Sequence, residues 1–280
     1  MRRITFSIFV LGLATFLLVA CEKTVTPGSN FNATQAINAV VQQNVNQMLA
    51  NVNTGIAAGI VWQKTGAGWT VLGNPPSCPD PLQLQSPVDV AKATAILYPG
   101  QTRGGNYKPH GGFRFSSATN TVPVRAPLDA QLVEGSRYIE QGETQYLLVF
   151  QNPCGLRYRF DHLLTLAPAF ATVVATLPAA QVDQSQTTAF ANPVQVSAGD
   201  VIASAVGFAK TKNVSVDFGV YDLRQKNAAS KNATWAASHD VEQAQYALCW
   251  LDLLPAAEVT TMKALPGADQ TAGKTSDYCT

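Results

Sequence analysis

The central part of the chain consists of short apolar runs that are separated by turn residues. In the segment between two of these runs, residues 152–155 read Asn-Pro-Cys-Gly, in which proline and glycine favour the backbone angles of a tight turn. The pattern predicts a mainly β domain built from antiparallel strands. The runs that we read as strands are residues 122–126, 130–135, 145–152 and 156–164.

One helix is predicted ahead of this domain, at residues 33–51. Its apolar residues recur at three- and four-residue spacing and form one stripe opposite a face of glutamine and asparagine. Thr34 can cap its first turn. Such a stripe fits a short helix packed on the main domain, and a partner-binding helix is the alternative. Residues 55–72 then alternate and predict a hairpin that turns at residues 65–68.

The first twenty residues have the pattern of an export signal. Arg2 and Arg3 precede an apolar run at residues 4–20, which is short for a membrane-spanning helix of ~20 residues. The run ends in Leu-Val-Ala before Cys21, and this ending resembles a bacterial lipobox. An ordinary secretory signal is the alternative.

The lipobox resemblance implies that residues 1–20 are removed and that Cys21 carries a thioether-linked diacylglycerol. Several acyl chains on one residue anchor a protein stably in a membrane. Residues 21–30 are polar, contain a Pro-Gly pair and predict a short tether. By the same resemblance, Glu22 after the cysteine implies the outer membrane. We therefore expect a lipid-anchored protein of the bacterial cell envelope that faces the periplasm.

Composition narrows the range of partners. Hydrophobic residues make up 46% of the 280 residues and charged residues only 13%, so the chain can bury a core but has a thinly charged surface. Removing Arg2 and Arg3 with the signal leaves 17 of the 19 basic residues against 18 acidic ones. This balance gives no basic patch for a phosphate backbone, so we expect no nucleic-acid partner.

The first candidate chemistry lies at residues 98–115. Turn residues lead to His110, which is followed by Gly111 and Gly112 and then by the apolar run at residues 113–115. Glycine tolerates backbone angles that other residues avoid. We therefore interpret the pair as a hinge at the start of a strand, from which an imidazole can reach a cleft.

Five blocks around this histidine follow one another in the order of a known family. Residues 110–115 (HGGFRF) resemble H-x-G-x-D, and residues 124–135 (VRAPLDAQLVEG) resemble V-x-A-P-x-D-G-x-V-x-x-x-G. Residues 158–163 (YRFDHL) resemble a Y-x-H-L strand of greater length. Residues 199–207 resemble G-x-x-I-x-x-x-G, and residues 214–220 (VSVDFGV) align with H-x-H-F-E-V. Together they resemble the lysostaphin-type (LytM-like) zinc metallopeptidases.

The resemblance implies a fold and a domain plan. The family fold is an antiparallel β-sandwich or barrel with a duplicated hybrid motif, and we expect it at residues 81–224. Residues 31–80 would then hold the N-terminal helix and hairpin, and residues 225–280 a C-terminal extension whose apolar segment docks on the barrel. Residues 166–195 exceed the family pattern. We expect this insertion to flank the groove, as either a short helix or a lid.

The zinc-binding places of the family are changed in this chain. By the resemblance, zinc would be held at His110, Arg114 and Asp217, and the general base would stand at Ser215. A guanidinium is always protonated and has no lone pair to offer, so Arg114 is not a metal ligand. We predict that the metal and the peptidase activity are lost. We also hypothesise that Arg114 and Asp217 form a partly buried ion pair at the position of the lost zinc.

The resemblance places His162 in the same cleft as His110. Asp161 precedes it, but adjacent residues of a strand point to opposite faces, so we expect no Asp161-His162 dyad. If the protein is an active zinc enzyme, His110 and Asp217 would need a third donor such as His162 or Asp222, since a catalytic zinc takes three protein ligands. His162 would then be the catalytic histidine. His239 is expected in a loop.

These residues support one functional prediction and two alternatives. We predict a non-catalytic, lipid-anchored envelope protein whose peptidase-like groove binds peptidoglycan or a cell-wall hydrolase. The groove residues would be His110, Arg114, His162, Ser215 and Asp217, with no cofactor. One alternative is an active zinc metalloendopeptidase that cleaves peptidoglycan cross-links. The other is a structural lipoprotein with a vestigial groove.

Four cysteines follow the lipidation site. An even number in an exported chain predicts two disulfides, for which three pairings are possible. We favour the pairing that ties down the C-terminal tail, which has little else to hold it. This pairing joins Cys78 to Cys154 and Cys249 to Cys279.

Overall fold

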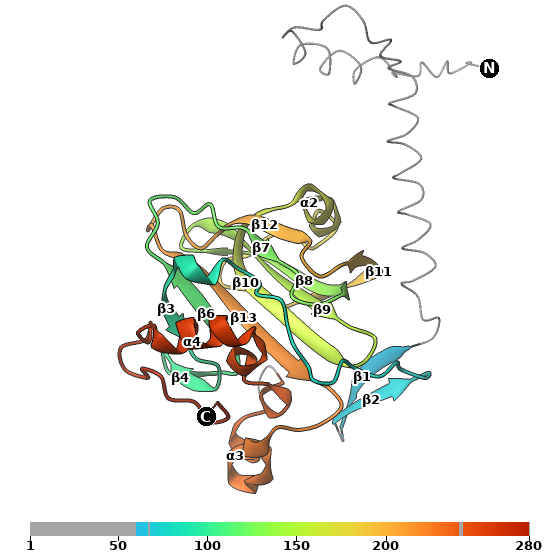
Figure 1. Cartoon of the computed structure of the whole chain (residues 1–280). Coiled ribbons are helices and arrows are strands. Elements are labelled where there is room, and N and C mark those ends of the chain that lie inside the picture. Colours follow the sequence, from blue (N-terminus) through green and yellow to red (C-terminus); the bar gives the residue numbers. More distant parts are fainter. Residues whose placement is uncertain (1–59, 67, 241–242, 280) are drawn as a thin grey trace, which may run out of the picture. The chain divides into compact units, whose positions relative to one another are not determined.

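The computed structural model describes residues 60–66, 68–240 and 243–279 (Figure 1). The predicted export signal, the lipid anchor at Cys21, the tether and the helix at residues 33–51 lie outside the described residues. The described part belongs to one compact unit and is mainly β, as the apolar runs predict. Within it, no helix has both the length and the hydropathy needed to cross a membrane.

Nine strands of the described part form one antiparallel sheet. Their order is β11-β8-β9-β10-β13-β6-β3, and β12 pairs with both β10 and β7. The predicted turn at residues 152–155 joins β9 to β10, with Gly155 at φ 105°. In chain order the strands are β3 (Ala93–Leu97), β6 (Gly111–Phe115), β7 (Val124–Arg125), β8 (Ala130–Glu140), β9 (Glu143–Gln151), β10 (Leu156–Leu166), β11 (Thr188–Val196), β12 (Val201–Val206) and β13 (Val214–Asp222).

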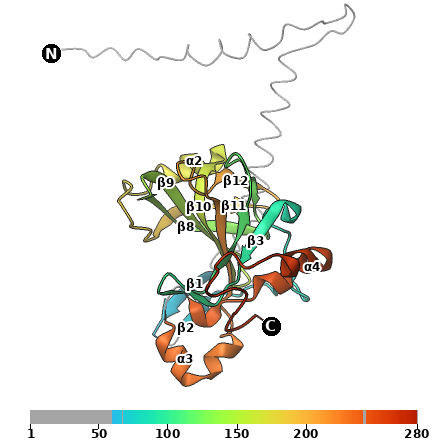
Figure 2. The same ribbon diagram turned by 90° about the vertical axis from the view of Figure 1, so that its left-hand side faces the viewer.

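Two separate hairpins and several short helices surround this sheet. The hairpin of β1 (Val61–Thr65) and β2 (Gly68–Leu72) is the one that the sequence predicts. A second hairpin joins β4 (Gln101–Arg103) to β5 (Asn106–Lys108). Helix α2 lies at one end of the unit, beside β12, and α3 lies at the other end, beyond β2 (Figure 1, Figure 2). The α-helices are α2 (Pro168–Val174), α3 (Ala233–Ser238) and α4 (Ala256–Ala264).

The two faces of the main sheet differ in polarity. On β10, Tyr158 and Phe160 are buried in the hydrophobic core. The alternate residues Arg157, Arg159 and Asp161 are also buried, but they lie on the opposite face, as the two-residue period of a strand requires. We call this second face the polar face. It is the face that carries the candidate site.

The C-terminal extension completes the core beneath that site. Trp250 begins a 3-10 helix (Trp250–Leu253) and is 0% exposed. Its ring centroid lies 4.9 Å from that of Phe113 on β6 and 5.1 Å from that of Phe218 on β13. The prediction that this apolar segment docks on the strands is confirmed.

The insertion at residues 166–195 leads into strand β11, which the sequence analysis did not predict. After α2 the chain reaches the edge of the sheet, where Asp183 N–H bonds the carbonyl of Ile139 at 2.8 Å, and then forms β11 along β8. Residues 183–187 lie between these two contacts. Asp183, Ser185, Gln186 and Thr187 from this stretch line cavities on the polar face, so the insertion does flank the groove.

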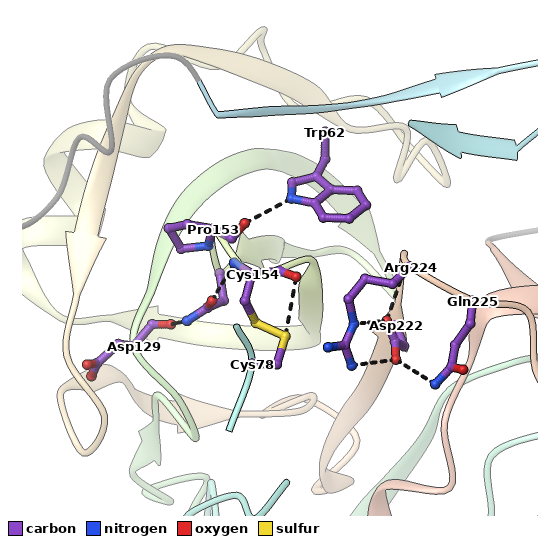
Figure 3. Close-up of a disulfide and its surroundings, with 9 residues drawn as sticks. Trp62, Cys78, Asp129, Pro153, Cys154, Asp222, Arg224 and Gln225 are labelled. Atoms are coloured by element: carbon purple, nitrogen blue, oxygen red, sulfur yellow. Dashed lines mark hydrogen bonds and ion pairs between the residues drawn. A yellow bond between two sulfur atoms is a disulfide. The ribbon is translucent and has the colours of Figure 1, made fainter. Parts of the chain in front are cut away.

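Both disulfides have the favoured pairing. Cys78 and Cys154 are joined with Cα atoms 5.1 Å apart, and Cys249 and Cys279 with Cα atoms 5.0 Å apart. The first bond fastens the segment before the sheet to the β9–β10 turn, where Trp62 of the β1–β2 hairpin donates its Nε1–H to the carbonyl of Pro153 at 3.0 Å (Figure 3). The β1–β2 hairpin is therefore attached to the main sheet at this turn.

The second disulfide allows a test of how the C-terminal tail is held. Replacing both Cys249 and Cys279 by serine should lower the free energy of unfolding by about 2–4 kcal/mol, because the bond restricts the unfolded chain. Denaturant unfolding measures the change. The matched control is Lys92→Ala, whose side chain is largely exposed, and we expect it to change stability by less than about 0.5 kcal/mol. An unchanged double-serine variant would show that other contacts hold the tail.

Candidate functional site

A bulge in β10 organises the candidate site. Strand β10 pairs with β13 up to Asp161, and from Leu163 onward it pairs with β12 instead. Between them, His162 adopts φ 60°, and the register against β9 shifts. A bulge of this kind inserts a residue and re-aims side chains. It absorbs part of the extra length that distinguishes residues 158–163 from a Y-x-H-L strand.

The bulge overturns one expectation from the sequence. Asp161 and His162 do not point to opposite faces, since both line the same cavity on the polar face. Tyr138 of β8 connects them: its hydroxyl donates to Oδ1 of Asp161 at 2.6 Å and lies 3.4 Å from Nδ1 of His162. The alternation of side chains between the two faces fails here because His162, with its positive φ, interrupts the strand.

Tyr138 is a site residue that the sequence gave no signal for. Burial, together with the charge of Asp161 and the hydrogen bond to it, raises the pKa of Tyr138 well above its ordinary value. The phenol therefore stays protonated and acts as a donor. Arg159 completes this group through an ion pair of 2.7 Å between Nη2 and Oδ2 of Asp161.

His110 and Asp217 form the centre of the site. Nε2 of His110 lies 3.2 Å from Oδ2 of Asp217, and Nε2 of His162 lies 3.8 Å from the same oxygen. His110 is 3% exposed and Asp217 is 8% exposed. The structure thus brings together three of the predicted groove residues, His110, His162 and Asp217, around one carboxylate.

Two glycines make room for this pair. A Cβ at Gly112 would lie 2.6 Å from the carbonyl oxygen of Val216 and 2.9 Å from Oδ1 of Asp217. A Cβ at Gly219 would lie 2.9 Å from Cβ of His110. Gly112 is extended within β6 and pairs with Asp217, so the interpretation of a glycine hinge is wrong. Glycine is needed here because the site packs against bare backbone.

The surroundings of Asp217 favour its charged form. Burial alone raises the pKa of this carboxyl, but the hydrogen bond with His110 and the charges of His162, His110 and Arg114 outweigh it. The net pKa lies well below its ordinary value. Oδ1 of Asp217 is buried and has no hydrogen-bond partner in the described part of the chain.

The hypothesis of a direct Arg114–Asp217 ion pair is wrong. Both residues lie on the polar face, but Arg114 pairs across the strands with Ser215, two residues along from the Gly112–Asp217 pair. Within the described residues, the ion-pair partners of Asp217 are His110 and His162. Arg114 acts on the carboxylate through its charge at longer range.

Two other predicted positions lie away from this centre. Ser215 is fully buried, and its Oγ has no hydrogen-bond partner among the described residues. Asp222 is five residues beyond Asp217 on β13, which corresponds to about 16 Å along a strand. Its carboxylate is bonded by Arg224 and Gln225 (Figure 3). Asp222 therefore does not serve as a third donor beside His110.

His110 is positioned by residues that the sequence did not single out. The guanidinium of Arg103 donates to the carbonyl of His110 at 3.0 Å and to that of Tyr98 at 2.8 Å. Tyr278, next to the disulfide-bonded Cys279, donates its hydroxyl to the carbonyl of Pro109. The β4–β5 segment and the C-terminal tail thus fix the backbone on both sides of the imidazole.

His239 has a different environment from the other two histidines. It follows α3, where its ring stacks on Trp235 at 4.5 Å and meets the edge of Tyr107 at 4.1 Å. It does not line the cavity that holds His110 and His162. We assign it to packing between α3 and the β4–β5 hairpin.

Three adjoining cavities form a groove along the polar face. The His/Asp cavity, of about 250 Å³, contains His110, His162 and Asp217. An arginine cavity of about 360 Å³ shares Arg159 and Ser185 with it. A third cavity, of about 460 Å³, shares Glu134 and Arg157 with the second and is bordered by two indoles, so we call it the indole cavity.

The donors at the His/Asp cavity do not fit a zinc ion. A catalytic zinc takes three protein ligands. Among the described residues, no three or more His, Cys, Asp or Glu side chains are grouped so as to hold a metal. His110 and Asp217 bond each other, and Arg114 stands at the third place implied by the resemblance. The arrangement of His110, His162 and Asp217 can offer hydrogen bonds and charge.

Comparisons of the sequence with family models and with curated proteins give no match. The resemblance to lysostaphin-type enzymes thus rests on the five blocks of this sequence, and membership of that family stays a prediction.

Proposed function

We propose that the groove of the polar face binds a peptide of peptidoglycan at the cell envelope and does not cleave it. The observation that carries the proposal is the state of the His/Asp cavity. Its central carboxylate, Asp217, has Oδ2 at 3.2 Å from Nε2 of His110 and at 3.8 Å from Nε2 of His162, so the two groups at the centre of the cavity are occupied with each other. Such a cavity can recognise polar groups, and binding is the function that it supports best.

The charged side chains of the groove favour a peptide that carries both charges. The His/Asp cavity presents Glu140 and Asp183 beside Lys108. Glu140 and Asp183 are accessible on its rim, whereas Arg159 is buried and paired with Asp161. Peptidoglycan stems contain carboxylates and an amino group. The choice of peptidoglycan rests on the family resemblance, and fold likeness alone does not fix a function.

The proposal predicts saturable binding without turnover. The purified full-length protein should sediment with isolated peptidoglycan sacculi and release no soluble fragments. Replacing His162 by alanine should weaken binding at least tenfold, or about 1.4 kcal/mol, because the ring faces Glu140 at 3.7 Å and Asp217 at 3.8 Å inside the cavity. Lys92→Ala, away from the groove, is the matched control and should bind as wild type.

Other results would replace the proposal. Release of muropeptides together with stoichiometric zinc would show a peptidase. Capture of an envelope hydrolase with no affinity for bare sacculi would make a protein the ligand. Failure to bind either one would leave a structural role, in which case His162→Ala would have no binding phenotype.

A further inference from the structure

The indole cavity differs in chemistry from the rest of the groove. Its lining includes Trp62 and Trp69 from the β1–β2 hairpin and a set of side-chain amides from the main sheet. At about 460 Å³ it is larger than the His/Asp cavity. The functional proposal above makes no use of it.

The amides form a row across three adjacent strands. Gln195 of β11 pairs with Gln131 of β8, which pairs in turn with Gln151 of β9. All three line the indole cavity. Each amide has two donor hydrogens and an acceptor oxygen, so it can bond a neighbour and a ligand at the same time. The row offers a flat, neutral set of donors and acceptors.

Two indoles line the same cavity as this row. The register of the hairpin pairs Trp62 with Val71 and Trp69 with Lys64, which puts both tryptophans on one face of the hairpin. The indole N–H of Trp62 donates a hydrogen bond to the carbonyl of Pro153. An indole combines a large apolar surface with one polar edge, which suits a ligand that has both apolar and polar sides.

The charges of this cavity cancel one another. Of its lining residues, Glu134 and Arg157 are the charged ones, and they form an ion pair of 2.5 Å. Arg157 also lies 5.3 Å from the centre of the Trp69 ring. A charged ligand would have to compete with this pair, whereas a neutral ligand would leave it intact.

We propose that the indole cavity binds a neutral saccharide. A pyranose ring has an apolar face of C–H groups that can pack on an indole, and its hydroxyl and amide groups can bond the glutamine row. An apolar peptide side chain fits less well, because it would cover the amide of Gln151 and offer it no hydrogen bond, and burying a polar group in this way is unfavourable. This inference adds a second ligand chemistry to the groove and does not depend on peptide binding at the other end.

The test is a calorimetric titration of the full-length protein with a tetramer of β-1,4-linked N-acetylglucosamine. We expect saturable binding by the wild type. Gln151→Leu keeps the size of the side chain but removes its donors and acceptor, and it should weaken binding at least tenfold. His162→Ala, in the His/Asp cavity, is the matched control and should change the affinity for the tetramer less than twofold.

A second variant tests whether weaker tetramer binding could result from misfolding. Trp69→Phe keeps an aromatic ring in the hairpin and should weaken tetramer binding while the thermal unfolding curve stays cooperative. No saturable binding by the wild type would overturn the inference, and so would equal affinities of the wild type and Gln151→Leu. Tetramer binding by the wild type, together with unchanged sacculus binding by His162→Ala, would count against the peptide proposal alone.

Discussion

Replacing Asp217 by alanine should lower the free energy of unfolding by about 3–5 kcal/mol. The change removes a carboxylate that lies 3.2 Å from Nε2 of His110, whose side chain is buried as well. Removing one member of a buried pair is costly because the interaction is lost while the other member stays buried. Denaturant unfolding of the variant and the wild type measures the difference.

The control for this result lies on the rim of the same cavity. Asp183 also lines the His/Asp cavity but is exposed, so Asp183→Ala should change stability by no more than about 0.5 kcal/mol. Equal stability of Asp217→Ala and the wild type would show that the cost of burying the carboxylate cancels the gain from its partners.

The stabilisation by Asp217 should depend on pH in a defined direction. Its pKa is lowered in the folded protein, so its contribution is present above the unfolded-state value of about 3.9 and is lost as the pH falls towards the lower folded value. The difference in melting temperature between wild type and Asp217→Asn should therefore shrink between pH 5 and pH 2. A difference that grows on acidification would contradict the assignment.

The strands and their turns could be predicted because they depend on local patterns. The turn at residues 152–155 and the hairpin of residues 61–72 follow from proline, glycine and alternating residues, and both are present. The two disulfides also have the favoured pairing. Strand β11 was missed because its residues include Asn192 and Pro193 and give no clear period, so its place beside β8 is fixed by tertiary contacts.

The site was harder to predict because its geometry depends on one irregular residue. His162 at φ 60° breaks the alternation of β10, and this break brings Asp161 and Tyr138 together. The signal that existed was the greater length of residues 158–163 compared with the Y-x-H-L pattern. The Arg114–Asp217 hypothesis failed for a related reason: strand alignment gives the face of a residue but not its exact cross-strand partner, which for Arg114 is Ser215.

The position of Trp250 links the site to the C-terminal extension. Its neighbours Phe113 and Phe218 follow Gly112 and Asp217 directly in β6 and β13, so the ring packs beneath the two strands that hold the central carboxylate. Adjacent residues in a strand face opposite sides. The extension thus supports the polar face from the core side.

Replacing Trp250 by alanine should therefore cost about 3–5 kcal/mol of stability and lower the melting temperature, because a fully buried indole leaves a cavity that the two phenylalanines do not fill. Trp250→Phe should cost less, since it keeps a ring and removes an Nε1–H that is buried without a partner in the described part. Trp235→Ala, at a partly exposed ring on α3, is the matched control, with an expected cost of about 1 kcal/mol. If Trp250→Ala matched this control, the extension would be an attachment to the sheet rather than part of its core.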